Sequence, residues 1–180
     1  MPGGRLPLRI FEPRYLTMVK DCLKSNSGFG VCLISDGREV GPPARTYPYG
    51  TLIKIVDWDT DDSGLLQIVT EGVQKFRTVS SKDSKTGLLI GDVEMLSLEK
   101  KTPIPAEFQG LAELLQPALD SLGPLFDYTE ADLTDAVWVG GRLVELLPMV
   151  SGKRHEMISM DNPLDRLRAL QDYVDDETNW

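Results

Sequence analysis

The sequence has few of the residues that most often carry enzyme chemistry. It contains 2 cysteines and 1 histidine among 180 residues. The histidine, His155, stands among Lys153, Arg154 and Glu156, which indicates a solvated surface position rather than a general base. The scarcity of histidine therefore leaves little material for a Ser–His–Asp triad.

The two cysteines follow apolar patterns and are expected to be buried. Cys22 lies on the apolar face of a predicted helix, and Cys32 lies within the apolar run 29–34. Small buried thiols without a disulfide pattern suit a reducing compartment, so we expect a cytoplasmic protein. No signal peptide precedes Arg5 and no apolar run approaches the length of a membrane span, so no membrane association is expected.

Nucleotide hydrolysis has no sequence support. A phosphate-binding loop needs Gly-x4-Gly-Lys-Ser/Thr, and no such run occurs. Gly140 and Gly141 lie inside a helical pattern and indicate close packing instead. The chain is acidic, with a net charge of −9 and a pI of about 4.6, so it would be repelled by a phosphate backbone. Nucleic acid is therefore not an expected partner.

Two further groups of residues resemble sites but fail on spacing. Ser151 and Lys153 are two residues apart and would not face each other on a helix, so Ser151 is expected to be an N-cap. Four aspartates cluster at one turn, but an EF-hand beginning at Asp57 would need glycine and glutamate where Asp62 and Ile68 stand. We therefore expect no catalytic residue, no metal and no cofactor. The aspartates are Asp57, Asp59, Asp61 and Asp62.

Short β-rich runs dominate the chain up to residue 101. The segments 59–64 and 80–87 are polar and are predicted to be turns or loops. Gly72 lies between two apolar runs, which indicates a β-bulge or a bend. The predicted strands are 6–10, 29–34, 51–58, 65–71, 73–79 and 88–96.

One helix is predicted among these strands. Pro13 suits the first turn of a helix, where the N–H groups have no intrahelical partner. The apolar residues that follow recur with helical spacing and predict one buried face. They are Tyr15, Leu16, Val19, Cys22 and Leu23.

Helical patterns replace strand patterns after the proline-containing connection 102–105. Pro117 is expected to kink or split the first of these helices. Thr129-x-x-Asp132 resembles a capping box, Asn162-Pro163 a second helix start, and the tail 175–180 is expected to fray. The prediction is an α+β fold, with residues 1–101 forming a β domain with one inserted helix and residues 102–180 an α-helical subdomain.

Several segments in this order resemble one known family. Residues 6–15 read Leu-Pro-Leu-Arg-Ile-Phe-Glu-Pro-Arg-Tyr, and residues 72–77 read Gly-Val-Gln-Lys-Phe-Arg, with Lys75 where the family usually has arginine. Together with 50–55, 146–148 and 165–167, they resemble the Lon protease N-terminal (substrate-binding) domain family, in particular its stand-alone bacterial members.

The resemblance implies a PUA-like β-barrel followed by an α-helical bundle. It also implies a non-catalytic domain that binds unfolded or tagged polypeptides, with an ATP-dependent protease as a candidate partner. Family members usually carry a further strand before the segment that begins at Met1. If that strand is missing, the barrel has an unpaired edge through which a homodimer could form.

The candidate polypeptide-binding residues are aromatic and charged residues near predicted strand ends. Aromatic side chains anchor many interfaces, but here they could equally be core residues. Glu12 and Arg14 would point apart on a helix, so each is expected to find a partner elsewhere. The candidates are Phe11, Glu12, Arg14, Tyr15 and Tyr49.

A second class of function stays open at this point, namely a small-ligand or RNA-binding barrel. PUA-like folds serve several functions, so fold alone does not decide between them. Lys75, Arg77, Lys82 and Lys85 could form a basic patch, although neighbouring acidic residues oppose it.

Overall fold

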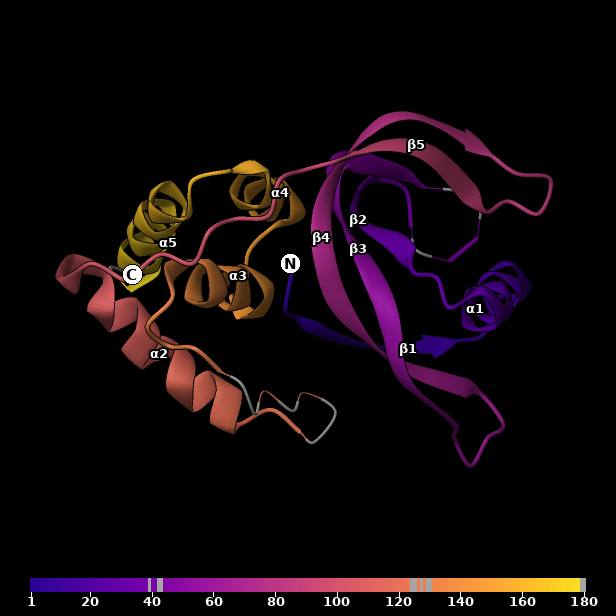
Figure 1. The fold of residues 1–180 in the computed structure, drawn as a ribbon, viewed down its shortest axis with the longest axis horizontal. Helices are drawn as coiled ribbons and strands as arrows, with labels where there is room; N and C mark the ends of the chain where they lie inside the picture. The colour runs from indigo at the N-terminus through magenta and orange to yellow at the C-terminus, as the bar shows by residue number, and fades with distance from the viewer. Residues whose placement is uncertain (39, 42–43, 124–125, 127, 129–130, 179–180) are drawn as a thin grey trace. The chain divides into compact units, whose positions relative to one another are not determined.

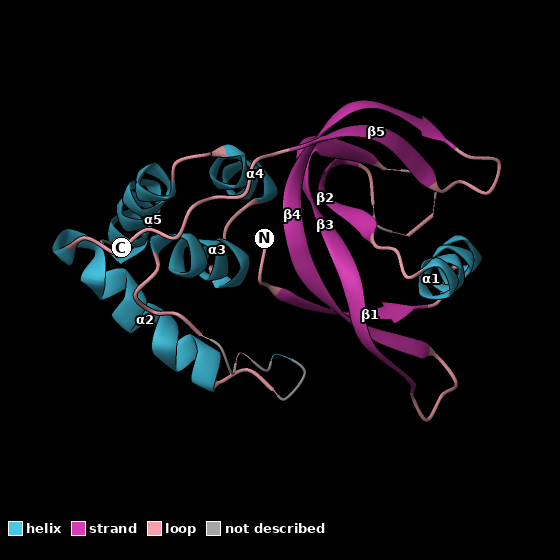
Figure 2. Cartoon of the chain, viewed as in Figure 1, coloured by secondary structure: helices cyan, strands magenta, loops and turns pink. Residues whose placement is uncertain are grey.

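The computed structural model describes residues 1–38, 40–41, 44–123, 126, 128 and 131–178. The chain divides into two compact units (Figure 1). Residues 2–97 form a β unit, and residues 98–180 together with Met1 form a helical unit. Figure 2 shows the strands and one helix in the first unit and the other helices in the second, so the chain is of the α+β class, as predicted.

The β unit is built on an antiparallel sheet with the order β1-β4-β3-β2. The first half of β4 pairs with β1 and its second half with β5, so β1 and β5 share one edge of β4. No pairing in the described residues joins β2 to β1 or β5, and closure into a PUA-like barrel stays a prediction. The strands are β1 (Arg5–Ile10), β2 (Phe29–Asp36), β3 (Arg45–Thr60), β4 (Leu66–Asp83) and β5 (Leu89–Met95).

Strand β4 unites two strands that the sequence pattern separates at Gly72. Ile53 of β3 pairs with Gly72 and Leu52 with Gln74, which leaves Val73 as the extra residue of a β-bulge. The prediction of a bulge here is confirmed. The prediction of a loop from residue 80 is wrong for its first part, because β4 continues to Asp83 by pairing with β5.

Gly50 permits close packing of its neighbours in the β unit. A Cβ atom there would lie 2.6 Å from the Phe76 ring, the Cys32 sulfur and the Val31 carbonyl oxygen. Such distances are far below van der Waals contact, and the Val31 carbonyl belongs to the backbone and cannot turn away. The Phe76 ring, which is buried, therefore occupies the space that a side chain at position 50 would need.

Helix α1 (Pro13–Ser25) packs on the β unit with the predicted face. Pro13 stands in its first turn, and Val19 and Cys22 are buried. Leu16 and Leu23, which the spacing also assigned to this face, are exposed because they lie at its margins. The core cluster under α1 contains Ile10, Val19 and Ile68, with Leu8, Tyr15, Met18, Phe29, Ile55 and Leu66 packed against it.

The helical unit has one core cluster that all of its helices help to form. Helix α3 supplies more of the buried residues than any other helix and contacts α2, α4 and α5. Gly140 lies against Arg166 and Leu167 of α5, which agrees with the close packing expected there. The elements are a 3₁₀ turn η1 (Ala106–Phe108), α2 (Gln109–Asp120), α3 (Ala136–Leu146), α4 (Ser151–Ser159) and α5 (Pro163–Thr178).

Several predicted helix ends in this unit differ from the observed ones. Helix α2 is not split, because it runs through Pro117 to Asp120. Thr129 lies outside the described residues, and α3 begins only at Ala136, where Asp135 accepts a hydrogen bond from Val137 N. Helix α5 continues to Thr178, so the tail is helical over most of the length expected to fray.

The caps of α4 and α5 have different outcomes. Ser151 is the first residue of α4 and not its cap, since Val150 precedes it without a side-chain hydrogen bond. Asn162 caps α5 as predicted, because its Oδ1 accepts from Leu164 N at 2.9 Å. A serine inside the first turn can leave its hydroxyl in water, which explains why residue type alone misplaced this cap.

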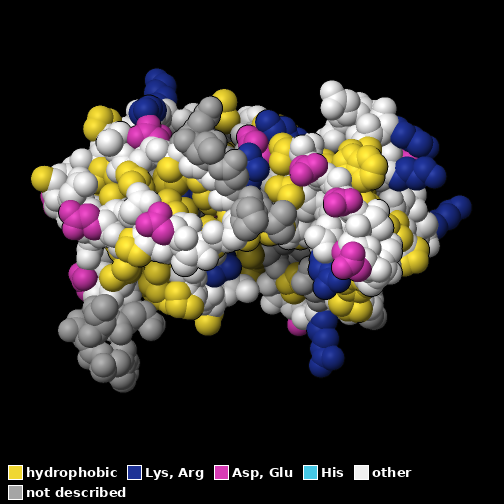
Figure 3. Space-filling model, turned by 90° about the horizontal axis from the view of Figure 1, so that it is seen from below, with side chains coloured by type: hydrophobic (Ala, Val, Ile, Leu, Met, Phe, Trp, Pro, Cys, Tyr) yellow, Lys and Arg dark blue, Asp and Glu magenta, His cyan; other side chains and the backbone are white. Residues whose placement is uncertain are grey.

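Apolar side chains also remain on the surface of both units. Figure 3 shows one face of the molecule, on which they lie among charged side chains. In the β unit, large exposed examples include Phe11, Trp58 and four residues of β5. Single exposed apolar residues are ordinary, so only those grouped on one element carry an argument about binding.

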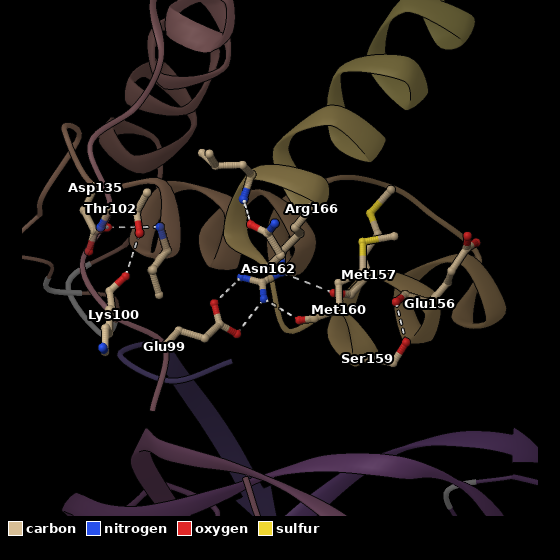
Figure 4. A network of polar contacts seen from close by, with 12 residues as sticks. Glu99, Lys100, Thr102, Asp135, Glu156, Met157, Ser159, Met160, Asn162 and Arg166 are labelled. Carbon is tan, nitrogen blue, oxygen red and sulfur yellow. Dashed lines mark hydrogen bonds and ion pairs between the residues drawn. The ribbon is translucent and has the colours of Figure 1, made fainter. Parts of the chain in front are cut away.

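A buried ion pair joins the start of the helical unit to its last helix. Arg166 of α5 has no exposed surface, and its two terminal nitrogens lie 2.9 and 2.5 Å from the Glu99 carboxylate oxygens (Figure 4). The same guanidinium donates to the carbonyl oxygens of Met157 and Met160. The segment after β5, the end of α4 and α5 are thus held by one side chain.

We expect Arg166→Met to destabilise the protein by about 3–5 kcal/mol, because it leaves the Glu99 carboxylate buried without its cation. Urea unfolding measures the change. Arg168→Met is the matched control on the same helix, because the ion pair of Arg168 with Asp165 is exposed. It should change the unfolding free energy by less than about 0.5 kcal/mol. Equal effects of the two substitutions would contradict the assignment.

Gly50→Ala should lower the unfolding free energy by about 1–3 kcal/mol, because the new methyl group overlaps Phe76 and the Val31 carbonyl. Gly110→Ala is the control, since nothing lies within 4 Å of a Cβ at Gly110 in α2. That change should stabilise the protein by about 0.5–1 kcal/mol through helix propensity. Thermal unfolding of both variants tests the close approach, and an unchanged Tm for Gly50→Ala would disprove it.

Candidate functional site

Phe11 and Glu12 form the short link between β1 and α1. Ile10, the last residue of β1, is buried, and Pro13 begins the helix three residues after it. The chain must turn from the sheet into the helix within this link, and Phe11 is left 52 % exposed. An aromatic ring thus lies in solvent between two elements that are both anchored in the core.

Glu12 and Arg14 pair with each other, which corrects the prediction that they point apart, although Arg14 also has a distant partner, as expected. Arg14 Nη2 lies 2.9 Å from Glu12 Oε2. The rule that residues two apart do not meet applies within a helix. Glu12 precedes the helix, with φ −80° and ψ 132°, and this extended backbone lets its carboxylate reach the first turn.

Arg14 also connects α1 to the turn between β4 and β5. Its Nη1 donates to the Gly87 carbonyl oxygen at 2.8 Å, and its guanidinium carbon lies 4.8 Å from the centre of the Tyr15 ring. The side chain is only 9 % exposed, so these contacts are largely shielded from water. Arg14 therefore acts as a structural tie.

The two candidate tyrosines have different surroundings. Tyr15 packs against the core cluster under α1, which favours the core interpretation for this residue. Tyr49 is half-buried in β3, opposite Arg77 of β4. The hydrogen bond and ion pair that link Glu12, Arg14 and Gly87 do not include Tyr49. The structure thus groups four of the five candidates at the β1–α1 junction and places the fifth on the sheet.

The cluster of aspartates is organised as a hairpin turn. Asp61 accepts hydrogen bonds from Ser63 Oγ at 2.5 Å, from Arg9 at 2.6 Å and from the Leu65 N–H at 3.0 Å. The bonds from Ser63 and Arg9 hold the pKa of Asp61 well below its usual range. Within the described ranges, no three His, Cys, Asp or Glu side chains are arranged to hold a metal ion.

Of the residues that could be considered for hydrolysis, Lys153 has a structural partner in α4. Lys153 Nζ lies 3.1 Å from Glu156 Oε2 in an exposed i,i+3 ion pair. His155 is half-buried rather than fully solvated, and burial lowers its pKa. An ammonium group held by a carboxylate is a poor base for a serine hydroxyl.

The basic residues considered for the RNA-binding alternative are not uniformly exposed. Lys75 is 3 % exposed, so it contributes little to an exterior potential. Arg77 is exposed but lies 2.6 Å from Glu94 of β5. Lys75 and Arg77 therefore add little positive potential to the exposed Lys82 and Lys85, whereas nucleic acid requires a continuous basic stripe.

Strand β5 carries exposed apolar residues that sequence reasoning missed. The apolar run was recognised as a strand, but nothing in its pattern showed that the strand would lie at an edge. All of its residues are exposed. The apolar ones are Leu89, Ile90, Val93 and Met95.

In the described part of the chain, no helix has the length and apolar character needed to span a membrane.

Comparison with known proteins gives consistent results. The family model of the ATP-dependent protease La (LON) substrate-binding domain matches residues 1–176. Lon protease 2 of Myxococcus xanthus is 23 % identical over 177 residues, which are 97 % of this chain but 20 % of that protein. The chain thus spans about one fifth of that relative.

Solved structures of similar fold support the same grouping. The Lon N-terminal domain protein from Xanthomonas campestris is 35 % identical, with a TM-score of 0.78 over 96 % of this chain and 91 % of that one. The N-terminal domain of Mycobacterium avium complex Lon protease has 15 % identity and a TM-score of 0.60, and the match covers 98 % of this chain and 92 % of that one. The match of the family model over nearly the whole sequence shows that this chain belongs to the ATP-dependent protease La (LON) substrate-binding domain family.

Proposed function

We propose that this chain is a non-catalytic domain that binds unfolded or tagged polypeptides. The observation that carries the proposal is the exposed ring of Phe11, held at the β1–α1 junction of a substrate-binding family fold. Aromatic side chains supply large contact areas at little cost in conformational entropy, and they dominate many interfaces. An unfolded chain offers the apolar side chains that such a ring would contact.

The junction suits this role because its polar residues are already ordered. Glu12 and Arg14 are paired, and Arg14 also holds Gly87. A fixed backbone on both sides of Phe11 lowers the entropy that binding must overcome. Glu12 and Arg14 are therefore proposed to position Phe11, whereas Tyr15 contributes to the core beneath it and Tyr49 is a separate candidate on β3.

Charge distribution argues against the RNA-binding alternative. Residues 2–97 contain 12 Lys or Arg and 12 Asp or Glu, whereas residues 98–180 contain 7 and 16. The net charge of −9 therefore lies entirely in the second stretch, and the β unit is balanced. Neither unit offers the excess of positive charge that drives binding to phosphate backbones.

An ATP-dependent protease is a candidate partner, because the Myxococcus relative is named as a Lon protease and this chain matches one fifth of it. A domain that binds polypeptides but does not cut them would need another protein, or another part of a longer chain, to supply the hydrolysis. A homodimer through an unpaired strand edge remains an expectation of the same kind.

Phe11→Ser should weaken binding of a permanently unfolded protein, such as reduced and carboxymethylated α-lactalbumin, by about 30-fold, because truncating an interface anchor costs roughly 2 kcal/mol. Fluorescence anisotropy of the labelled probe measures the affinity. Trp58→Ser is the matched control, since Trp58 is equally exposed but lies in β3. Thermal unfolding should show both variants folded. If Trp58→Ser weakens binding as much as Phe11→Ser, the junction is not the site.

The purified chain should hydrolyse neither ATP nor casein, because it lacks a phosphate-binding loop and Lys153 is held by Glu156. A coupled phosphate assay and release of fluorescent casein fragments test this. Turnover that disappears in Ser151→Ala, with the fold intact, would overturn the non-catalytic assignment.

A further inference from the structure

Strand β5 is an edge strand with one free hydrogen-bonding side. It pairs with β4 from Met95, opposite Phe76, to Leu89, opposite Asp83. In the described residues no strand pairs with its other side. The outer N–H and C=O groups of such a strand are a template for a further strand, so this edge needs either protection or a partner.

The two faces of β5 differ in chemistry. Leu89, Val93 and Met95 share one face with Gly91, because side chains alternate along a strand, and they are 38 %, 45 % and 41 % exposed. They belong to neither of the two core clusters of the described residues. The other face presents Asp92 and Glu94 beside Ile90. The edge therefore offers an apolar row on one side and a carboxylate row on the other.

The carboxylates of β5 lie beside basic and hydroxyl side chains of the neighbouring strand β4. On this face Arg77 of β4 is opposite Glu94, and their side chains lie 2.6 Å apart. Asp92 accepts a hydrogen bond from Ser80, also of β4, at 2.7 Å. Basic and hydroxyl groups thus lie on the inner strand and acidic groups on the edge strand, so an added strand would meet negative charge.

This charge pattern disfavours pairing between two copies of β5. An antiparallel pair centred on Asp92 would place Asp92 opposite Asp92, and one centred on Val93 would place Asp92 opposite Glu94. Like charges directly opposite each other destabilise a sheet. A strand with lysine or arginine at these positions would instead be stabilised by cross-strand ion pairs.

The edge is also held in place before any partner binds. Gly87, in the turn that precedes β5, accepts the hydrogen bond from the buried Arg14 guanidinium of α1 at 2.8 Å. This tie fixes the end of the hairpin to the helix. A preformed edge loses less conformational entropy on binding than a mobile one.

We propose that the free edge of β5 binds an extended polypeptide segment as an added strand and selects segments in which Lys or Arg alternate with apolar residues. The inference rests on the proposed polypeptide-binding function and names its substrate class. Main-chain hydrogen bonds along β5 supply affinity, while the apolar row and the carboxylate row supply sequence preference. The Phe11 ring then serves as a second, less selective contact for the same chain.

The test uses the full chain and three fluorescent nine-residue peptides. One alternates lysine and valine, one alternates glutamate and valine, and one has the composition of the first in blocks. The alternating basic peptide should bind about tenfold more tightly than the other two. The glutamate peptide would place its carboxylates opposite Asp92 and Glu94, and like charges destabilise a sheet. The block peptide would place lysine on both faces of its strand in one half and valine on both faces in the other. Equal binding of the two lysine peptides would show that net charge alone is read, and would overturn the proposal.

Charge reversal on the edge provides the matched pair of variants. Asp92→Lys should weaken binding of the alternating basic peptide by about tenfold and strengthen binding of the acidic one. Asp62→Lys makes the same change in net charge at an exposed turn residue of the same unit and should leave the preference unchanged. If both variants act alike, long-range electrostatics and not the β5 edge sets the preference.

Hydrogen exchange locates the bound peptide. With the alternating basic peptide, every second amide of β5 should become protected, because only alternate N–H groups face the free edge. Protection elsewhere with none on β5 would overturn this inference while leaving polypeptide binding intact. Failure to bind either peptides or an unfolded protein would overturn the proposed function itself. Protection of β5 that rises with protein concentration alone would assign the edge to a second copy of the chain.

Discussion

The buried contact between Arg166 and Glu99 holds three segments of the helical unit together. Removing both charges from water is costly, and the cost is offset only because the guanidinium meets both carboxylate oxygens and two backbone carbonyls. Those partners belong to the segment after β5 and to the end of α4, while Arg166 itself belongs to α5. The ion pair therefore selects one arrangement of three segments, which an apolar core alone would specify less strictly.

Strand β4 has the corresponding role in the β unit. It is long enough to pair with β1 along one half and β5 along the other, and the bulge at Val73 lets it bend between them. The ends of β1 and β5 are then joined through α1, because Arg14 reaches the carbonyl of Gly87. Both surfaces proposed to bind polypeptide, the Phe11 ring and the β5 edge, depend on this one strand for their position.

Much of the fold could be predicted because its signals are local. Pro13 marks the start of α1 and Asn162 caps α5, and each needs only neighbouring residues to do so. The start of α3 was predicted too early, since Asp135 caps it while also accepting from the Thr102 N–H, 33 residues away. Of the candidate site, the exposed Phe11 could be named in advance, but the Glu12–Arg14 pair could not, because helical spacing does not apply to an extended cap residue.

The sequence by itself determined the α+β class, the family and the scarcity of histidine and cysteine, because all three depend on residue type and spacing along the chain. Only the tertiary structure decided which strands became edges and which charges became buried. In the sequence, nothing distinguishes Lys75 and Arg166 from lysines and arginines that are exposed. Lys75 is nevertheless buried in the β unit, and Arg166 is buried in the helical unit. Strand pairing and burial depend on contacts between segments that are distant in the sequence. Short-range sequence patterns do not specify which segments make those contacts.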